Sequence, residues 1–329
     1  MSKYIRIAVS AILLTVIAWR TDWSVVADKF ANLEIGFWLA AVGVLVAAQF
    51  VSARRWQIFA RELRFGQTLR QYSAYYFIGM YFNLALPTSV GGDVMRVFFL
   101  DAKSGRKLAA FASVLLDRAN GLVVLIAMAC LGVLIAPVAL PWWIHACVWG
   151  VAGAAVVGIA LLPVVQNARF LPVQRRQQIK TMILLMRIPR VFFGTTAMSI
   201  LVQAFGVFTL WLVSLSLGLE IPIAYCCVLG PMVSLLTLLP ISVNGMGVRE
   251  LGTVVFLAPM GVDADSAKTL AFLWFAVNVA VSLLGGLVYL AGAYPKAQAA
   301  PDEKEGTADH GPVDRDSDQG REGQHQKAA

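Results

Sequence analysis

Charged residues are scarce in this chain. Only 14% of its 329 residues are Asp, Glu, Lys or Arg, and 59% are hydrophobic. A soluble domain averages about 25% charged and about 45–50% apolar residues, so the composition excludes a soluble globular protein. Several uncharged runs approach or exceed the ~20 residues that cross a bilayer as a helix, most clearly 122–140, 142–165 and 191–219. The composition predicts an all-α integral membrane protein with one membrane domain.

Metal-binding and redox residues are also few. The chain has three histidines and four cysteines, and no cysteines form a CxxC pair. Cysteines in apolar runs act as small packing residues, and these four (Cys130, Cys147, Cys226 and Cys227) lie in or beside such runs. No cluster has the spacing of a zinc site, and no P-loop motif is present to bind ATP. We expect no metal and no cofactor. The net charge of +8 comes with no nucleic-acid motif, so we expect no nucleic-acid partner.

The basic residues are concentrated in three short connections. Lys and Arg number five in 54–70, three in 101–107 and six in 166–190, whereas the other connections between apolar segments together hold three. Cytoplasmic loops of membrane proteins carry an excess of Lys and Arg. We therefore expect these three loops on the cytoplasmic side.

The loop assignment constrains the crossings. The three basic loops share one side only if segment 72–100 enters the membrane from that side, turns and leaves on the same side. By the same logic, segment 223–258 enters from the opposite side and leaves there, before the acidic loop near Asp263. The full crossings are then 5–19, 36–53, 108–136, 142–165, 191–218 and 267–293. The sequence predicts about six full transmembrane helices plus two oppositely oriented re-entrant hairpins forming an inverted repeat, with halves at 36–165 and 191–293 and both termini cytoplasmic.

A repeated phrase lies inside each predicted hairpin: LPTSVGGDVMR at 86–96 and LPISVNGMGVR at 239–249. Six of the eleven positions are identical. We expect Pro87 and Pro240 to stop each entering helix, and Gly91, Gly92, Gly245 and Gly247 to permit the turns. Ser89, Ser242 and Asn244 are expected to satisfy the freed backbone groups. Inverted, interrupted segments are typical of a transporter whose site lies near the interface of its repeats.

Six charged residues fall in or beside apolar segments: Asp93, Arg96, Asp117, Arg118, Arg249 and Glu250. Each costs about 2.5–3.5 kcal/mol at a helix centre unless it is paired or hydrated. One interpretation is internal pairing, of Asp93 with Arg96 and of Arg249 with Glu250. The other is a hydrated cavity in which the two arginines bind an anionic group, because a guanidinium matches phosphate or carboxylate.

The same charges and the neighbouring polar residues form the predicted substrate-binding set. Asp117 and Asn120 are spaced i,i+3 and share a helix face, from which Asp117 could pair with Arg96 or Arg249. With the six charged residues, the set is completed by Asn120, Ser89, Ser242 and Asn244.

The segments FNLALPTSVGGDVMRVFFL, ASVLLDRANGL and LPISVNGMGVRELG together resemble the transmembrane flippase domain of lysylphosphatidylglycerol synthases over roughly residues 5–293. The resemblance implies a bacterial inner-membrane protein that moves a lipid between leaflets. The lipid could be an aminoacylated phospholipid, a hopanoid or a polyprenyl-linked lipid. It implies membrane lipids with an anionic headgroup as partners, and enzymes of lipid or glycan synthesis as a second class of partner. We expect a membrane domain at 1–295 and a disordered cytoplasmic tail at 296–329 in place of an aminoacyl transferase domain, and hence no enzymatic activity.

Three alternatives to a lipid flippase or lipid transporter stay open on the sequence. The chain could be a secondary transporter of a small anionic solute, or a non-catalytic membrane subunit of a lipid or glycan pathway. A membrane enzyme with Asp93 and Asp117 as catalytic carboxylates is the third, although no acidic pair or metal cluster is visible to support it.

Overall fold

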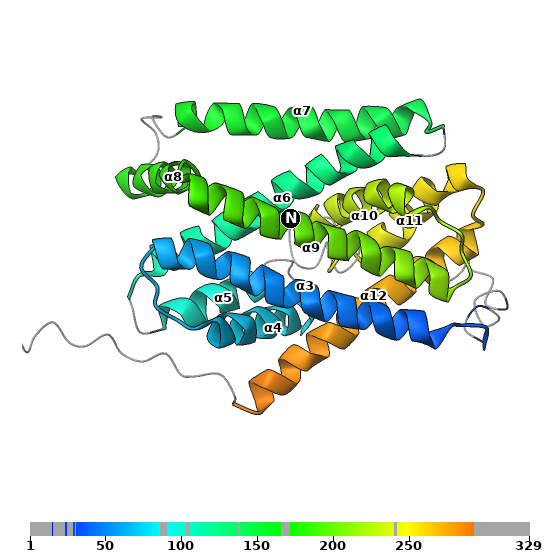
Figure 1. The fold of residues 1–329 in the computed structure, drawn as a ribbon, viewed down its shortest axis with the longest axis horizontal. Coiled ribbons are helices and arrows are strands. Elements are labelled where there is room, and N and C mark those ends of the chain that lie inside the picture. The colour runs from blue at the N-terminus through cyan, green and yellow to red at the C-terminus, as the bar shows by residue number, and fades with distance from the viewer. Residues whose placement is uncertain are drawn as a thin grey trace, which may run out of the picture.

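The structure is a computed structural model that describes residues 15, 24, 29, 31–85, 91–102, 105–136, 139–165, 172–239 and 242–292. Within these residues the regular elements are all helices (Figure 1), which confirms the predicted all-α class. They are α3 (Ile35–Glu62), α4 (Leu69–Ala85), α5 (Gly91–Asp101), α6 (Lys107–Ile135), α7 (Trp142–Val165), α8 (Val173–Met186), α9 (Pro189–Ser216), α10 (Ile223–Leu238), α11 (Val248–Leu257), the 3₁₀ turn η1 (Ala258–Met260) and α12 (Ala264–Leu290). Pro87, Ser89, Pro240, nearly all of the predicted crossing 5–19 and the tail 296–329 lie outside the described residues.

Five helices are long and apolar enough to cross a membrane: α3, α6, α7, α9 and α12. They coincide with the five predicted crossings that fall within the described residues. Their outward surfaces are apolar, most clearly on α7, where only Ile144 and Val148 are buried. A helix that is apolar all round is a core or membrane helix, and α7 is not in the core. The chain is a multi-pass helical membrane protein.

The shorter helices α4 and α5 form a hairpin. Tyr75 stacks on Phe99 with ring centroids 5.4 Å apart, and Asn83 contacts Gly92. Residues late in α4 therefore meet residues early in α5, so the two helices run antiparallel. The hairpin packs on α6 through α5, and on α3 and α12 through α4.

Helices α10 and α11 form a second hairpin. The Tyr225 hydroxyl, near the start of α10, donates a hydrogen bond to the carbonyl of Phe256, near the end of α11. In Figure 1 the two hairpins extend from opposite ends of the molecule toward its middle. Their breaks meet there, because Nδ2 of Asn244 lies 3.4 Å from the carbonyl oxygen of Leu84 at the end of α4.

The helices of the two parts of the chain pack in matching pairs. Helix α4 packs on α12, and correspondingly α10 packs on α6. Helix α5 packs on α6 as α11 packs on α12, and α3 packs on α4 as α9 packs on α10. Helices α3 and α9 pack on each other. Every one of these contacts is preserved when α3, α4, α5 and α6 are exchanged for α9, α10, α11 and α12.

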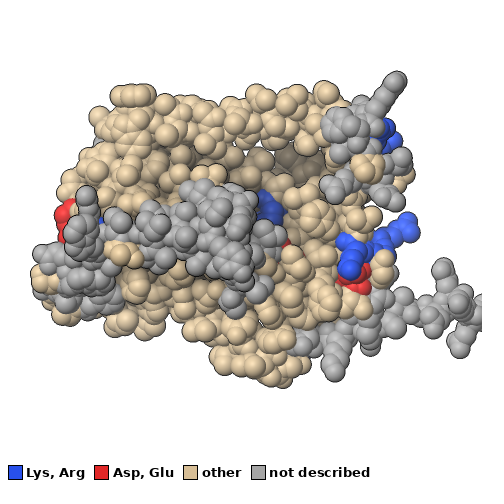
Figure 2. Space-filling view, turned by 180° about the vertical axis from the view of Figure 1, so that it is seen from behind, with Lys and Arg blue, Asp and Glu red and all other residues tan. Residues whose placement is uncertain are grey.

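The basic connections gather at one end of the molecule. Nη2 of Arg106 donates to the carbonyl of Leu63 at 2.7 Å, which joins the connection after α3 to the one after α5. Nε2 of Gln178 on α8 donates to the carbonyl of Leu108 at the start of α6. Figure 2 shows Lys and Arg mainly at this end of the long axis. The chain therefore leaves and regains the same end through the α4–α5 hairpin.

Candidate functional site

The break between α4 and α5 is held by close backbone packing. The amide of Gly92 donates to Oδ1 of Asn83 at 2.7 Å, which satisfies one of the free N–H groups at the start of α5. A Cβ added to Gly92 would lie 2.7 Å from the carbonyl carbon of Gly79. Gly91 and Gly92 are the first residues of α5, and their predicted turn role stays a prediction because residues 86–90 lie outside the described residues. Gly92 also permits the close approach of the two helices.

The break between α10 and α11 is a true left-handed turn. Asn244, Gly245 and Gly247 have φ values of +49°, +74° and +83°, a region that glycine adopts without strain. The predicted turn role of Gly245 and Gly247 is confirmed. Asn244 also satisfies a freed carbonyl, that of Leu84, as expected. The Ser242 hydroxyl oxygen is buried and has no hydrogen-bond partner among the described residues, so its predicted role is not observed.

Glu250 caps the helix that follows the second break. Its Oε2 accepts the amide of Gly247 at 2.6 Å, in the manner of a capping box, and the carboxylate lies at the positive end of the α11 dipole. The predicted pairing of Glu250 with Arg249 is not formed. The carboxylate of Glu250 is therefore hydrogen-bonded to the backbone of its own hairpin and not to Arg249.

Asp117 of α6 lies at the centre of a buried ion-pair network. Its Oδ1 accepts Nε of Arg55 at 2.7 Å, and its Oδ2 accepts Nη2 of Arg96 at 2.8 Å. The side chains of Asp117, Arg55 and Arg96 are 0%, 5% and 2% exposed. The predicted bond between Asp117 and Arg96 is confirmed. Arg55, which the sequence placed among the charges of loop 54–70, belongs to α3 and is a buried partner, so that loop assignment is corrected.

The remaining contacts of Arg96 also belong to the first half. Its guanidinium lies between the rings of Trp56 and Tyr76, 4.2 Å and 4.4 Å from their centroids, an arrangement that stabilises a desolvated cation. Nη1 of Arg96 lies 3.3 Å from Oδ1 of Asp93. The predicted internal pair therefore exists, but it is longer than the 2.8 Å pair of Arg96 with Asp117. Asp93 bonds more closely with Arg118, whose Nε and Nη2 donate to it at 3.0–3.1 Å.

Asn120 extends this network to α9. Its Oδ1 accepts the hydroxyl of Ser199, and Nη1 of Arg55 donates to the same hydroxyl at 2.8 Å. The polar residues of α3, α5, α6 and α9 therefore form one connected set. In this set each arginine forms an ion pair with a carboxylate of the protein, which gives the set the structure of internal pairing rather than of an open anion site.

Arg249 has different surroundings. Its guanidinium lies 4.6 Å over the ring of Phe275, and Nη2 donates to the backbone carbonyl of Asn244 at 3.1 Å. Nη1 is enclosed and has no hydrogen-bond partner among the described residues. No carboxylate of the described chain forms an ion pair with it. Arg249 therefore carries its positive charge inside the protein without an ion-paired carboxylate among the described residues.

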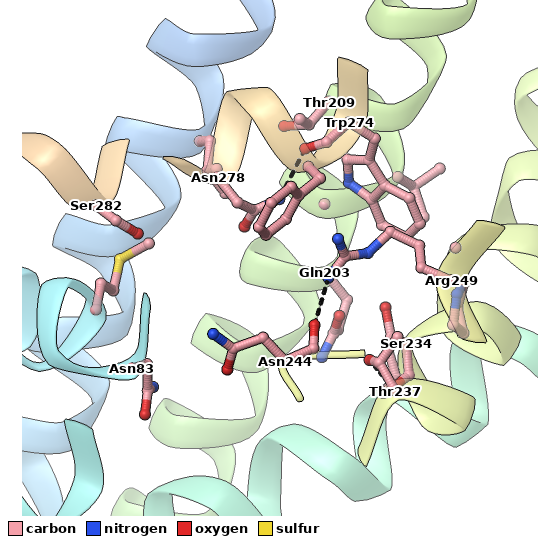
Figure 3. Close-up of a pocket in the computed structure, with 18 of the residues that line it drawn as sticks. Asn83, Gln203, Thr209, Ser234, Thr237, Asn244, Arg249, Trp274, Asn278 and Ser282 are labelled. Carbon is pink, nitrogen blue, oxygen red and sulfur yellow. Dashed lines mark hydrogen bonds between the residues drawn. The ribbon is translucent and has the colours of Figure 1, made fainter. Parts of the chain in front are cut away.

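The side chain of Arg249 faces a cavity of about 370 Å³. The cavity lies where the two hairpin breaks meet, between α3, α4, α6, α9, α10, α11 and α12 (Figure 3). Its polar lining consists of Asn83, Gln203, Thr209, Ser234, Thr237, Asn244, Arg249, Trp274, Asn278 and Ser282. Arg249 is the one charged residue among the lining residues, so the cavity is suited to a group that carries negative charge.

Sequence reasoning found part of this site. Of the predicted substrate-binding set, Arg249 and Asn244 line the cavity. Asp93, Arg96, Asp117, Arg118 and Asn120 form the network of the first half, and Glu250 is a helix cap. The lining residues that were missed, such as Gln203, Thr209 and Asn278, are single polar residues in apolar helices. That isolation was the available signal, because a buried polar group needs a partner.

The described residues offer no site for a metal ion. No group of three or more His, Cys, Asp and Glu side chains comes together in the part of the chain that the structure covers. The chemistry that the cavity provides is hydrogen-bond donation and one positive charge.

Comparison with known proteins gives one match. Residues 4–286 match the family described as the lysylphosphatidylglycerol synthase TM region. No curated protein and no solved structure matches the chain. The matched residues include both hairpins, the ion-pair network and the whole cavity, in agreement with the resemblance carried by the repeated phrase. The chain belongs to the family of the lysylphosphatidylglycerol synthase TM region.

Proposed function

We propose that the protein is a lipid flippase or lipid transporter that moves an anionic or modified lipid headgroup between leaflets. One observation carries the proposal. The cavity lies where two broken hairpins meet, and it holds Arg249, a cation without an acidic partner among the described residues. Non-helical backbone at membrane depth is tolerated where it is covered by protein or lines a polar cavity, and Asn244 of the second break lines this cavity.

The proposed architecture is six crossings and two re-entrant hairpins in an inverted repeat. The matching helix pairs support it, since exchange of the two sets of four helices preserves the contacts. In transporters of this kind the site lies near the bilayer midplane at the interface of the repeats. The concentration of basic residues at one end supports cytoplasmic termini in the bacterial inner membrane.

The size of the cavity fits a headgroup rather than a whole lipid. At about 370 Å³ it lies near the lower end of the roughly 300–1,000 Å³ of ligand pockets. The acyl chains would therefore stay in the bilayer while the headgroup passes between the halves. Arg249 would bind its phosphate, and amide and hydroxyl groups such as those of Gln203 and Ser234 would replace water around it.

A transporter of a small anionic solute is the second candidate, and the same cavity size favours it. A non-catalytic subunit of a lipid or glycan pathway would need neither the cavity nor its charge. The enzyme alternative would need a carboxylate in the cavity, and the lining residues include none.

Lipid movement can be measured in liposomes that contain phosphatidylglycerol labelled on an acyl chain, with dithionite to bleach the outer leaflet. We expect the protein to extend bleaching to the inner leaflet. Arg249→Ala should slow this phase about tenfold or more, because a charge-assisted hydrogen bond contributes about 1.5–3 kcal/mol. Arg190→Gln, which removes an exposed arginine at the start of α9, is the matched control.

Two results would refute lipid movement through this site: bleaching no faster than in protein-free liposomes, or equal rates for Arg249→Ala and the wild type. Uptake of the free headgroup without lipid movement would favour the solute transporter.

A further inference from the structure

The two repeated phrases end on Arg96 and Arg249, and these arginines have opposite environments. Arg96 is surrounded by its own protein. Its Nη2 donates to Asp117, Arg55 shares that carboxylate, and the Tyr76 ring covers one face of the guanidinium, so that its Nε alone has no hydrogen-bond partner among the described residues. Arg249 faces a cavity. The matching helix pairs allow the positions around the two arginines to be compared one by one.

Three residues around Arg96 have counterparts in the second half. Arg55 and Thr209 are each the twenty-first residue of their helices, α3 and α9. Tyr76 and Gly230 are each the eighth residue, of α4 and α10.

The third pair is Asp117 and Phe275. Each lies three residues before an asparagine, Asn120 in α6 and Asn278 in α12. The contacts agree with this alignment, because the guanidinium of Arg96 touches Asp117 and that of Arg249 touches Phe275.

The three counterparts line the cavity. Thr209, Gly230 and Phe275 are all among its lining residues. The first half fills the corresponding space with the long side chain of Arg55 and the ring of Tyr76, whereas the second half has a hydroxyl and a bare backbone. The cavity is therefore the space that the first half closes with its own side chains, and Phe275 stands where the first half supplies a carboxylate.

Two enclosed polar groups at this space have no hydrogen-bond partner among the described residues: Nη1 of Arg249 and Oγ1 of Thr209, whose residue is 1% exposed. Buried polar groups are nearly always paired, so each unpaired one requires an explanation. In the first half the two oxygens of Asp117 accept from Arg96 and Arg55. Thr209 and Arg249 hold the corresponding positions, and both are among the residues that line the cavity (Figure 3).

We propose that a ligand oxyanion takes the place of the missing carboxylate. The site binds one singly charged group with two free oxygens, a phosphodiester or a carboxylate, through Arg249 and Thr209. The first half is a permanently self-occupied copy of this site and binds no substrate. That the anion belongs to a lipid rests on the proposed function; the anion site itself does not.

Charge selects within this class of ligand. The cavity lining has one positive charge and no negative one, so a singly charged group is matched by Arg249, whereas a doubly charged phosphomonoester would retain one charge without a cationic partner in the lining. The site therefore favours a phosphodiester over a phosphomonoester.

The decisive variant is Phe275→Asp, which would give Arg249 the carboxylate that Arg96 already has. The probes are dihexanoyl phosphatidylglycerol, its deacylated form glycerophosphoglycerol, and phosphate-free dihexanoylglycerol, titrated into the purified full-length protein by calorimetry. We expect Phe275→Asp to weaken binding of phosphodiester probes at least tenfold, and Phe275→Asn, which removes the ring without adding charge, to weaken it much less. Dihexanoylglycerol should bind wild type and Phe275→Asp equally.

If Phe275→Asp does not purify as a folded protein, Arg249→Gln beside Arg190→Gln makes the same test. Equal affinity of Phe275→Asp and Phe275→Asn, full affinity of Arg249→Gln, or absence of phosphodiester binding to the wild type would each overturn the site. Tighter binding of the lipid than of glycerophosphoglycerol identifies a lipid source, and equal binding identifies a free solute; both support the anion site. If Phe275→Asp loses phosphodiester binding but the wild type moves no lipid in liposomes, the flippase proposal is refuted and the anion site is supported.

Discussion

Nε of Arg55 donates to Oδ1 of Asp117 across 2.7 Å, between two side chains that are almost completely buried. The pair joins α3 to α6, and Arg96 joins the same carboxylate to α5. One acidic residue thus forms ion pairs with two arginines from two other helices. Because all three would be costly alone inside a membrane protein, the network fixes how the first hairpin sits against the crossing helices.

Asp117→Asn should destabilise the protein strongly. The substitution keeps the shape of the side chain but leaves the buried Arg55 and Arg96 without their shared carboxylate, and removal of one partner of a buried ion pair typically costs about 3–5 kcal/mol. The measurement is thermal unfolding in detergent. Asp265→Asn is the control, because its pair with Lys268 lies near the surface, where an ion pair contributes about 0–1 kcal/mol. Equal melting temperatures for the two variants would contradict the structural role of Asp117.

Gly92→Ala should open the first hairpin. An added Cβ would lie 2.7 Å from the Gly79 carbonyl carbon, and since that atom is backbone the helices must separate, at a cost of about 1–3 kcal/mol or more. Gly43→Ala is the matched control in α3, where a Cβ meets nothing within 4 Å and alanine favours the helix by up to about 1 kcal/mol. In the same thermal unfolding measurement, Gly92→Ala should melt below the wild type and Gly43→Ala at a higher temperature than the wild type. A neutral Gly92→Ala would show that the close approach is not needed.

Much of the fold could be predicted because its signals are local. Long uncharged runs identify the spanning helices, and the repeated phrase marks both hairpins. Arg55 was misassigned because it stands beside Arg54 in the sequence, and only the packing of α3 on α6 buries one of them. The cavity could not be read from the sequence, since its lining comes from seven helices. Arg96 and Arg249 look equivalent in the repeated phrase, and the residues that distinguish them, Asp117 and Phe275, lie in other helices.

Asp263 should stabilise the start of α12 in a pH-dependent way. Its partial burial favours the neutral form, but the amides of Ser266 and Asp265 donate to the carboxylate and lower its pKa below the ordinary value. A lowered folded-state pKa means that the stabilisation is complete above the unfolded-state pKa of about 3.9 and is lost as the pH falls through the folded-state value.

Asp263→Ala should therefore lower stability near pH 7 by about 1 kcal/mol, as loss of an N-cap does, and the difference from the wild type should shrink at acidic pH. Asp263→Asn should keep most of the stability at every pH, because asparagine caps as well as aspartate. Melting temperatures between pH 3 and pH 8, about the range over which the carboxyl titrates, measure both. A constant difference for Asp263→Ala would show that ionisation of the carboxyl does not contribute.

The re-entrant course of the first hairpin can be tested with single cysteines in a background without the four native ones. Glu62→Cys and Lys107→Cys replace exposed residues before and after the hairpin, and Ala264→Cys replaces an exposed residue at the start of α12. The bond from Arg106 to the Leu63 carbonyl joins the first two regions at one end, so an impermeant maleimide should label both from the same side. The excess of basic residues predicts that this side is cytoplasmic, and Ala264→Cys should be labelled from the other side.

Labelling of Glu62→Cys and Lys107→Cys from opposite sides would mean that α4 and α5 together cross the membrane. The two breaks would then no longer enter from opposite faces, and the inverted repeat would lose its basis.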